Sequence, residues 1–283
     1  MEFLAIITVL AALQIWGYGA VPQHDDWLVA VHQRVSSINN LRLRLALLIM
    51  LPVFAVLLLQ VALEGVLWGL PLLLFYVAVL LYSLGRGDFR SHLALYTDAW
   101  HRGDLQGATE QAHELEGFDL SAVPGNASEL HAEVRKALFY QGFERWFAVV
   151  FWFVLLGPAA ALAYRLFRLL GNRPETSPEE QQLLDQGIQF LEWLPARLLA
   201  FTFAVVGDFD RVVSAVSAHL VEASRAPDLL ADSGHAALAS PMRDDCPADQ
   251  FASEAEAELS CAQKLISRSV VCWVAVLAVL QLF

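Results

Sequence analysis

The sequence predicts an all-α integral membrane protein that crosses the bilayer several times. Its 283 residues are 57% hydrophobic and only 17% charged, whereas soluble domains carry roughly 25% charged residues. The mean hydropathy is +0.49. Several runs without a charged side chain reach 19 residues or more, and about 20 apolar residues in a helix cross the hydrocarbon core. We therefore expect a polytopic protein with five or six membrane segments.

The first three segments lie within residues 1–85. The apolar run after Glu2 has no Lys or Arg ahead of it, so it lacks the basic region that begins a secretory signal peptide. We expect it to be retained as the first membrane helix. The second and third segments are the uncharged residues 45–63 and 65–85, each long enough to span the bilayer.

The fourth and last segments are also uncharged. Residues 146–164 form a run of 19 residues, which predicts one spanning helix. Residues 269–283 are only 15 residues long, and they reach a full span if the Arg268 side chain extends to the interface. We expect the last membrane helix over residues 265–283.

The fifth segment, residues 187–207, carries Pro195 and Arg197 near its middle. An Arg at the centre of a membrane helix costs about 2.5–3.5 kcal/mol, and each Leu, Val or Phe returns about 0.3–0.6 kcal/mol. Hydropathy therefore leaves open whether this segment crosses the membrane. Segments four and five together occupy residues 146–207, and a re-entrant path for one of them is an alternative to full crossing.

Lys and Arg near the ends of the segments predict the orientation. The loop after the first segment carries Arg34, Arg42 and Arg44, and the loop after the third segment is also basic close to its ends. We expect both loops in the cytoplasm and the N-terminus in the periplasm. Six full crossings would place Arg165 and the arginines after it outside, and for this reason the re-entrant alternative stays open.

The loop at residues 86–145 is too long for a simple connection. Apolar residues at nearly helical spacing predict one amphipathic helix over residues 89–116 and a second from Ser128. The Pro124-Gly125 turn separates them. We therefore expect a cytoplasmic helical hairpin.

Acidic residues dominate both regions outside the apolar runs. We expect residues 208–264 to form an acidic cytoplasmic linker and a short helix, because residues 225–258 are rich in Ala, Asp, Ser and Pro, which is typical of a partly disordered linker before such a helix. Residues 86–145 hold six basic and ten acidic residues, and the net charge of the chain is −12. Nucleic acid requires a basic surface, so we expect no nucleic-acid partner.

The sequence assigns no metal or cofactor. Its three cysteines contain no C-x-x-C pair, and we expect free thiols at Cys246, Cys261 and Cys272. The hairpin has one Glu-x-x-His motif, whereas carboxylate-bridged metal sites need matching motifs on facing helices. We therefore expect a solvated helix face at His92, Asp98, His101, Glu110, His113 and Glu114.

Polar residues at the membrane edge are stronger candidates for a ligand site, because burying a charge without a partner is costly. Glu192 and Arg197 flank Pro195, and Tyr164-Arg165 ends the fourth segment. A helix broken by proline can line a polar pocket. The candidate ligand-pocket residues are Arg197, Glu192, Trp193, Pro195, Arg165, Tyr164, Glu144, Gln141 and His92.

Three stretches carry a family resemblance. They are RGDFRSHLALYTDAWHRGDLQGA at residues 86–108, ALFYQGFERWFAVVFWFVLLGPAAALAYR at residues 137–165, and EWLPARLLAF at residues 192–201. In order and spacing they resemble the AmpE family of bacterial inner-membrane proteins, and this resemblance implies a link to control of β-lactamase induction. AmpE is in turn similar to CbiB, the membrane enzyme of cobalamin assembly that joins an aminopropanol arm to a corrinoid through an amide bond.

The chain departs from the CbiB-like pattern at polar positions that amide ligation would use. Tyr140-Gln141 stands where that pattern has a Glu-Asn pair, and Glu192 stands where it has Asn. ATP-driven ligation needs carboxylates to hold Mg²⁺ and to help deprotonate the amine. The resemblance therefore implies a retained pocket without retained catalysis, and we assign no catalytic residue.

We expect a sensor or signalling modulator linked to β-lactamase induction and peptidoglycan recycling. Its pocket near Arg197 is expected to bind a small anionic ligand or a lipid headgroup. Its acidic hairpin is expected to contact a cytosolic or membrane protein of the induction pathway. The alternative is an amide-bond-forming enzyme related to CbiB, acting on an unknown amine and carboxylate.

Overall fold

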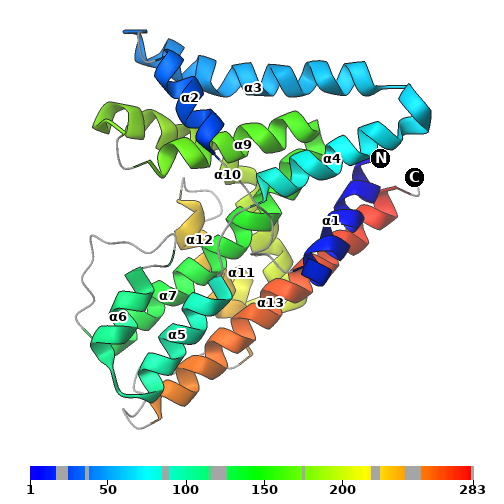
Figure 1. The fold of residues 1–283 in the computed structure, drawn as a ribbon. Helices are drawn as coiled ribbons and strands as arrows, with labels where there is room; N and C mark the ends of the chain where they lie inside the picture. The colour runs from blue at the N-terminus through cyan, green and yellow to red at the C-terminus, as the bar shows by residue number, and fades with distance from the viewer. Residues whose placement is uncertain are drawn as a thin grey trace. The chain divides into compact units, whose positions relative to one another are not determined.

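The computed structural model describes residues 1–16, 25–35, 38–84, 89–113, 115, 126–173, 176–217, 224–239 and 250–281. Every regular element within these ranges is a helix, as Figure 1 shows. The helices are α1 (Glu2–Trp16), α2 (Asp26–Val35), α3 (Leu41–Leu63), η1 (Val66–Gly69), α4 (Leu70–Ser83), α5 (Phe89–His101), α6 (Leu105–His113), α7 (Ala127–Gly142), η2 (Phe143–Phe147), α8 (Ala148–Leu156), α9 (Pro158–Gly171), α10 (Pro178–Val206), α11 (Phe209–Val216), α12 (Ala226–Ala237) and α13 (Phe251–Leu280).

The helices form two compact units. The first unit comprises Met1–Gly87 and Ala148–Glu192, and the second comprises Asp88–Phe147 and Trp193–Phe283. Helix α10 contributes residues to both units. The expected hairpin therefore packs in one unit with the C-terminal part of the chain.

The core of the first unit brings together α2, α3, α4, α9 and the start of α10. Leu28, Leu48, Leu166 and Leu184 are among its buried side chains. Burying a Leu side chain stabilises a fold by about 1.5–3 kcal/mol. Beside this core, Arg44 of α3 pairs with Glu180 of α10 at 3.0 Å.

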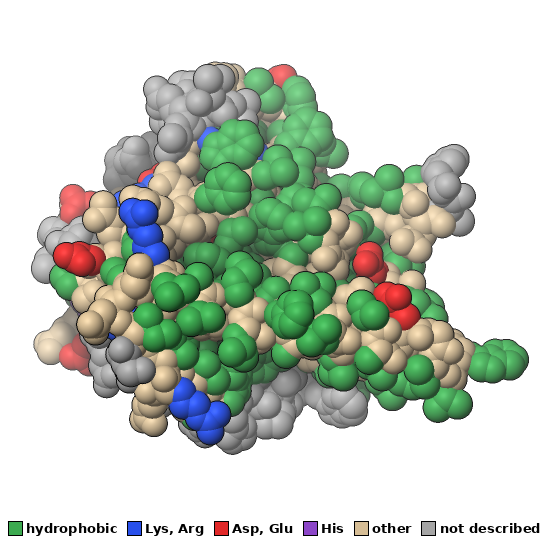
Figure 2. Space-filling view, turned by 90° about the horizontal axis from the view of Figure 1, so that it is seen from above, with side chains coloured by type: hydrophobic (Ala, Val, Ile, Leu, Met, Phe, Trp, Pro, Cys, Tyr) green, Lys and Arg blue, Asp and Glu red, His purple; other side chains and the backbone are tan. Residues whose placement is uncertain are grey.

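Four helical segments of the described chain are long and apolar enough to cross a membrane. They are Leu41–Leu63, Val66–Ser83, Pro178–Val206 and Phe251–Leu280, and α1 is a shorter apolar helix. Figure 2 shows a face on which hydrophobic side chains gather and charged ones are few. Exposure of such an apolar surface to water is unfavourable, whereas lipid can cover it. The prediction of an all-α membrane protein is confirmed. Exposed apolar side chains on α3 include Met50, Leu51, Phe54, Leu58 and Val61.

The fourth predicted segment is not one helix, so this expectation is wrong. The chain leaves α8 at Leu156 and starts α9 at Pro158, with Gly157 between them at φ 84°. Proline disfavours a helical conformation in the residue before it, and only glycine adopts this positive φ without strain. Helices α8 and α9 then pack against each other.

In its described residues the predicted hairpin is divided into α5, α6 and α7, with η2 starting at Phe143, rather than into two helices. The first predicted helix is divided into α5 and α6 around Gly103, whose φ is 70°. The second begins as predicted, because the Asn126 side chain caps α7 by accepting a hydrogen bond from the Glu129 amide at 2.8 Å. Glu114 and the Pro124-Gly125 turn lie outside the described residues.

The expected linker contains helix α12, so its description as a linker is wrong over Ala226–Ala237. Leu229, Leu230 and Ala237 are buried, and α12 packs against α7. At Gly234 a side chain has no room, since an added Cβ would lie 2.6 Å from the Phe139 ring. Close packing therefore stabilises a segment whose composition alone is typical of a loop.

The last helix begins earlier than expected. Helix α13 runs from Phe251 to Leu280 without a break, and its first half carries charged residues before the apolar run begins. Cys261 and Cys272 of this helix are free thiols, whereas Cys246 lies outside the described residues.

Candidate functional site

Helix α10 continues through Pro195. Proline has no N–H, so the carbonyl of Leu191, four residues earlier, loses its helical donor. The indole Nε1 of Trp152 donates to this carbonyl at 3.1 Å. A side chain of α8 therefore satisfies the carbonyl that the proline frees.

Arg197 is stabilised locally by Trp193, one turn before it in the second unit. Its Nη1 donates to the Trp193 carbonyl oxygen at 3.0 Å, and its guanidinium carbon lies 4.3 Å from the centroid of the Trp193 ring. The Trp193 side chain is exposed, and a cation over an exposed indole gains about 0.5–1 kcal/mol. These contacts offset part of the cost of placing a charge in an apolar helix.

Tyr164 and Glu192 form a buried pair in the first unit. The Tyr164 hydroxyl donates to Glu192 Oε1 at 2.9 Å, and both residues are at most 2% exposed. Arg165, beside Tyr164 on α9, is also buried. A carboxylate this deeply buried needs such a hydrogen bond, because its desolvation is otherwise costly.

The remaining candidates belong to the second unit. Gln141 lies near the end of α7 and Glu144 lies in the π-helix η2, and both are buried. His92 lies half-buried on α5. The structure thus brings four of the candidates together in two pairs, Tyr164 with Glu192 and Trp193 with Arg197. A single pocket formed by all nine candidates stays a prediction.

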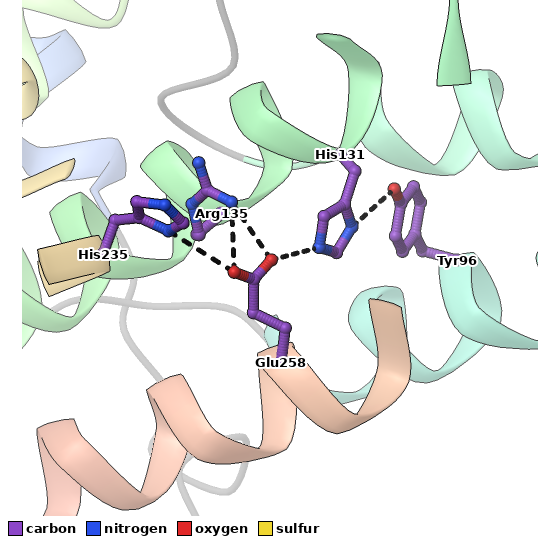
Figure 3. Close-up of polar contacts among 5 residues, drawn as sticks. All are labelled: Tyr96, His131, Arg135, His235 and Glu258. Atoms are coloured by element: carbon purple, nitrogen blue, oxygen red, sulfur yellow. Dashed lines mark hydrogen bonds and ion pairs between the residues drawn. The ribbon is translucent and has the colours of Figure 1, made fainter. Parts of the chain in front are cut away.

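A cluster that the sequence did not predict surrounds Glu258 in the second unit (Figure 3). Glu258 Oε2 lies 2.8 Å from His131 Nε2, and Arg135 Nη1 donates to both carboxylate oxygens at 3.0 and 3.2 Å. His235 Nδ1 lies 3.4 Å from Oε1. On the far side of the imidazole, the Tyr96 hydroxyl lies 3.3 Å from His131 Nδ1. The cluster joins α5, α7, α12 and α13.

Burial determines the chemistry of the Glu258 cluster. Glu258 and His131 are at most 1% exposed, so an unpaired carboxylate here would be very costly, and the Arg135 cation compensates its charge. A neutral His131 that donates from Nε2 to Glu258 accepts at Nδ1 from the Tyr96 hydroxyl. In this arrangement Tyr96 donates to His131 and His131 donates to Glu258. Burial also raises the pKa of Tyr96 above its usual range. The cluster can therefore hold four helices together and keep Tyr96 neutral as a donor.

Sequence patterns contained a partial signal for this cluster. His131 and Arg135 are four residues apart on α7, on one face of the helix. Glu258 lies on the same face of α13 as the buried Ala255, Leu259 and Ala262. An acidic residue on an otherwise apolar face predicts a buried partner, but His131 and Arg135 lie more than 120 residues away along the chain.

The hairpin residues proposed as a solvated face include a surface pair. His101 Nε2 lies 2.8 Å from Glu256 Oε2, and both side chains are about half exposed. Within the part of the chain that the structure describes, no group of three or more His, Cys, Asp and Glu residues is arranged to hold a metal ion.

One family of known proteins matches nearly the whole chain. The matching family is described as regulatory signalling modulator protein AmpE, and the match covers residues 1–282. The chain belongs to the AmpE family. The AmpE protein of Shigella flexneri is 28% identical over 229 residues, which make up 78% of this chain and 79% of that protein. The resemblance inferred from the sequence is thus confirmed.

Two proteins named cobalamin biosynthesis protein CobD are also similar to this AmpE-family chain. The CobD of Chromobacterium violaceum is 31% identical over 144 residues, which are 49% of this chain and 46% of that protein. The CobD of Stutzerimonas stutzeri is 27% identical over 149 residues, or 51% and 47% of the two chains. The chain therefore spans about half the length of each CobD, and these matches support a CbiB-like relationship. No solved structure matches the chain.

Proposed function

We propose that this AmpE-family protein is a bacterial inner-membrane sensor or signalling modulator of β-lactamase induction and peptidoglycan recycling. The observation that carries the proposal is the match to a regulatory signalling family over residues 1–282. Helices long enough to cross a membrane support its location. The basic residues near the ends of the first and third segments favour a periplasmic N-terminus and a cytoplasmic hairpin.

The proposed ligand is a small anion or a lipid headgroup held by Arg197. A permanent charge in an apolar helix is costly, and such charges commonly mark a functional site. The Trp193 ring and carbonyl orient the guanidinium. The planar, permanently charged guanidinium is the side chain that recognises carboxylates and phosphates most often, which favours an anionic ligand.

The proposed output is a protein contact made by the hairpin. Its acidic surface favours a partner with a basic face, because complementary charge raises the rate of association. The Glu258 cluster joins hairpin helices α5 and α7 to α12 and α13. A change in this packing is therefore a physical route by which a membrane signal reaches the hairpin.

Induction of β-lactamase tests the proposed function. The gene is deleted in its own bacterium, and β-lactamase activity is measured with and without an inducing β-lactam before and after the wild-type gene is restored. We expect the deletion to change the induced activity and the restored gene to reverse that change. Equal induction in the parent strain, the deletion strain and the restored strain would exclude this function.

The CobD matches favour a second candidate, an amide-bond-forming enzyme. This enzyme function requires that the carboxylates at or near the ligase-like positions, Glu144 and Glu192 among them, support ATP-driven chemistry. Saturable binding of Mg²⁺-nucleotide to the purified protein, lost in Glu144→Gln, would favour the enzyme. Absence of nucleotide binding and of turnover would leave the regulatory function.

A further inference from the structure

A cavity of about 560 Å³ opens in the second unit where α10 ends. Its wall is formed by the end of α10, the start of α11, the end of α12 and the middle of α13. Arg197 and the Glu258 cluster do not line it. The cavity is therefore separate from the candidate sites described above.

Three basic side chains line this cavity, and one of them is already engaged. Arg211 Nε donates to Asp208 Oδ2 at 2.7 Å, and Arg211 Nη2 donates to the Leu238 carbonyl oxygen at 3.0 Å. Lys264 and Arg268 lie one turn apart on α13 and are exposed. Within the described part of the chain neither forms an ion pair, so both offer donors to a ligand.

The positive charge of this cavity contrasts with the rest of the chain. The net charge of the protein is −12, and residues 174–265 hold five basic and sixteen acidic residues. Two of those five basic residues, Arg211 and Lys264, line the cavity together with Arg268. The acidic side chains of the wall are Asp208, which pairs with Arg211, and Asp210. The cavity wall is thus net positive in an acidic protein.

The cavity lies at the level where two apolar runs end. The Trp273 indole Nε1 on α13 donates to Thr202 Oγ1 on α10 at 2.9 Å, so the two helices meet at these residues. Val206 ends α10 four residues after Thr202, and Arg268 precedes Trp273 by five residues, so each lies about 6–8 Å from this contact along its helix. Beyond Arg268 the helix carries no charge up to Leu280. This level is therefore the expected edge of the hydrocarbon core.

Apolar side chains next to the cavity favour a ligand with an acyl chain. Phe201 and Val205 of α10 and Val271 of α13 are each more than half exposed. Phe209, at the start of α11, lines the cavity and is also about half exposed. A phospholipid would place its phosphate among the cations and its acyl chains along this apolar surface.

We propose that Lys264 and Arg268, with Arg211 behind them, bind the phosphate of an anionic phospholipid headgroup in this cavity. Free phosphate has the same charged group, but it lacks the acyl chain that the neighbouring apolar surface would cover. A bound lipid would contact α10, α11, α12 and α13 at once. Its presence would therefore tie the end of the α10 helix to the element that carries Glu258.

Lipid retention by the purified full-length protein tests this site. Wild type and Lys264→Gln/Arg268→Gln are exchanged into detergent with equal amounts of phosphatidylglycerol and phosphatidylcholine, and bound lipid is counted by native mass spectrometry. Two cations near a membrane surface strengthen anionic lipid binding by roughly 20- to 30-fold together, so we expect a loss of at least about tenfold in phosphatidylglycerol retention. The control Arg102→Gln/Arg225→Gln removes the same charge from exposed positions outside the cavity and should change retention less than about twofold.

Two further measurements separate the possible outcomes. Lys264→Arg/Arg268→Lys keeps both charges and should retain the lipid, which distinguishes charge recognition from a loss of folding. Inorganic phosphate should not displace the lipid, and displacement that depends on Lys264 and Arg268 would assign the site to a soluble phosphate instead. Equal retention of both lipids by wild type, or equal losses in the cavity and control variants, would overturn the proposal.

Discussion

Replacing Glu258 by Ala should destabilise the second unit strongly. The substitution leaves His131 Nε2, which is fully buried, without its acceptor and deprives Arg135 of a carboxylate that it contacts at 3.0 and 3.2 Å. Removing one partner of a buried ion pair costs about 3–5 kcal/mol. Because the Arg135 side chain keeps 17% exposure to solvent, we expect a loss near the lower end, about 3 kcal/mol. The free energy of unfolding is measured by titrating the purified protein from dodecylmaltoside micelles with dodecyl sulfate.

The chain offers a matched control for this substitution on the same helix. Glu256 also lies 2.8 Å from a histidine, His101, but the two side chains are 58% and 47% exposed. Exposed pairs contribute about 0–1 kcal/mol, so Glu256→Ala should change the unfolding free energy by less than about 1 kcal/mol. Similar small losses for both variants would refute the inference that burial makes the Glu258 cluster important. A Glu258→Ala/Arg135→Ala variant should lose less than the two single losses added together.

Three further substitutions test individual contacts. Trp152→Phe should cost about 1–2 kcal/mol, because it leaves the Leu191 carbonyl unsatisfied; adding Pro195→Ala should recover most of the loss by restoring an N–H, and no recovery would contradict this assignment. Gly234→Ala should lower the free energy of unfolding by about 1–3 kcal/mol, because the added Cβ would meet the Phe139 ring. Unchanged thermal denaturation would show that α12 shifts to make room for the methyl group. Burial raises the pKa of Tyr96. The free energy of unfolding should therefore fall as the pH rises above about 10, where the unfolded chain releases the Tyr96 proton and the folded chain keeps it. Tyr96→Phe should make the unfolding free energy less dependent on pH in this range, and an unchanged dependence would assign it to another group.

The membrane helices could be predicted because local composition determines them. The uncharged residues 45–63 lie within α3, whereas the predicted helix over residues 65–85 is divided into η1 and α4, with Leu67 and Trp68 at positive φ. A bilayer requires long apolar helices whatever the remaining chain does, since unsatisfied backbone groups are very costly in lipid. For these segments local composition is therefore enough to predict apolar helices.

The break in the fourth segment could have been predicted from two residues. Gly157-Pro158 lies in the middle of the run, and this pair disfavours a continuous helix. Hydropathy gave no weight to it, because neither residue is charged. The opposite error occurred at α12, where Ala, Asp, Ser and Pro suggested a linker although Leu229, Leu230 and Ala237 provide an apolar face.

The candidate site was less accessible to sequence reasoning than the fold. Membrane-edge position selected Tyr164 and Glu192 as candidates, and the structure joins the two by a buried hydrogen bond; their role in binding a ligand stays a prediction. The Glu258 cluster needs four helices to meet, and residues 131 and 258 are 127 positions apart. No local periodicity specifies such a meeting, because it depends on tertiary packing.

The central claim is that an Arg197-dependent membrane protein modulates β-lactamase induction. The most direct measurement is the induced β-lactamase activity of the deletion strain carrying wild type, Arg197→Ala or Arg102→Ala at equal membrane levels. Arg102 is an exposed hairpin residue, so its variant controls for loss of one charge. We predict that wild type and Arg102→Ala restore normal induction and that Arg197→Ala does not. Full restoration by a folded Arg197→Ala protein would contradict the claim.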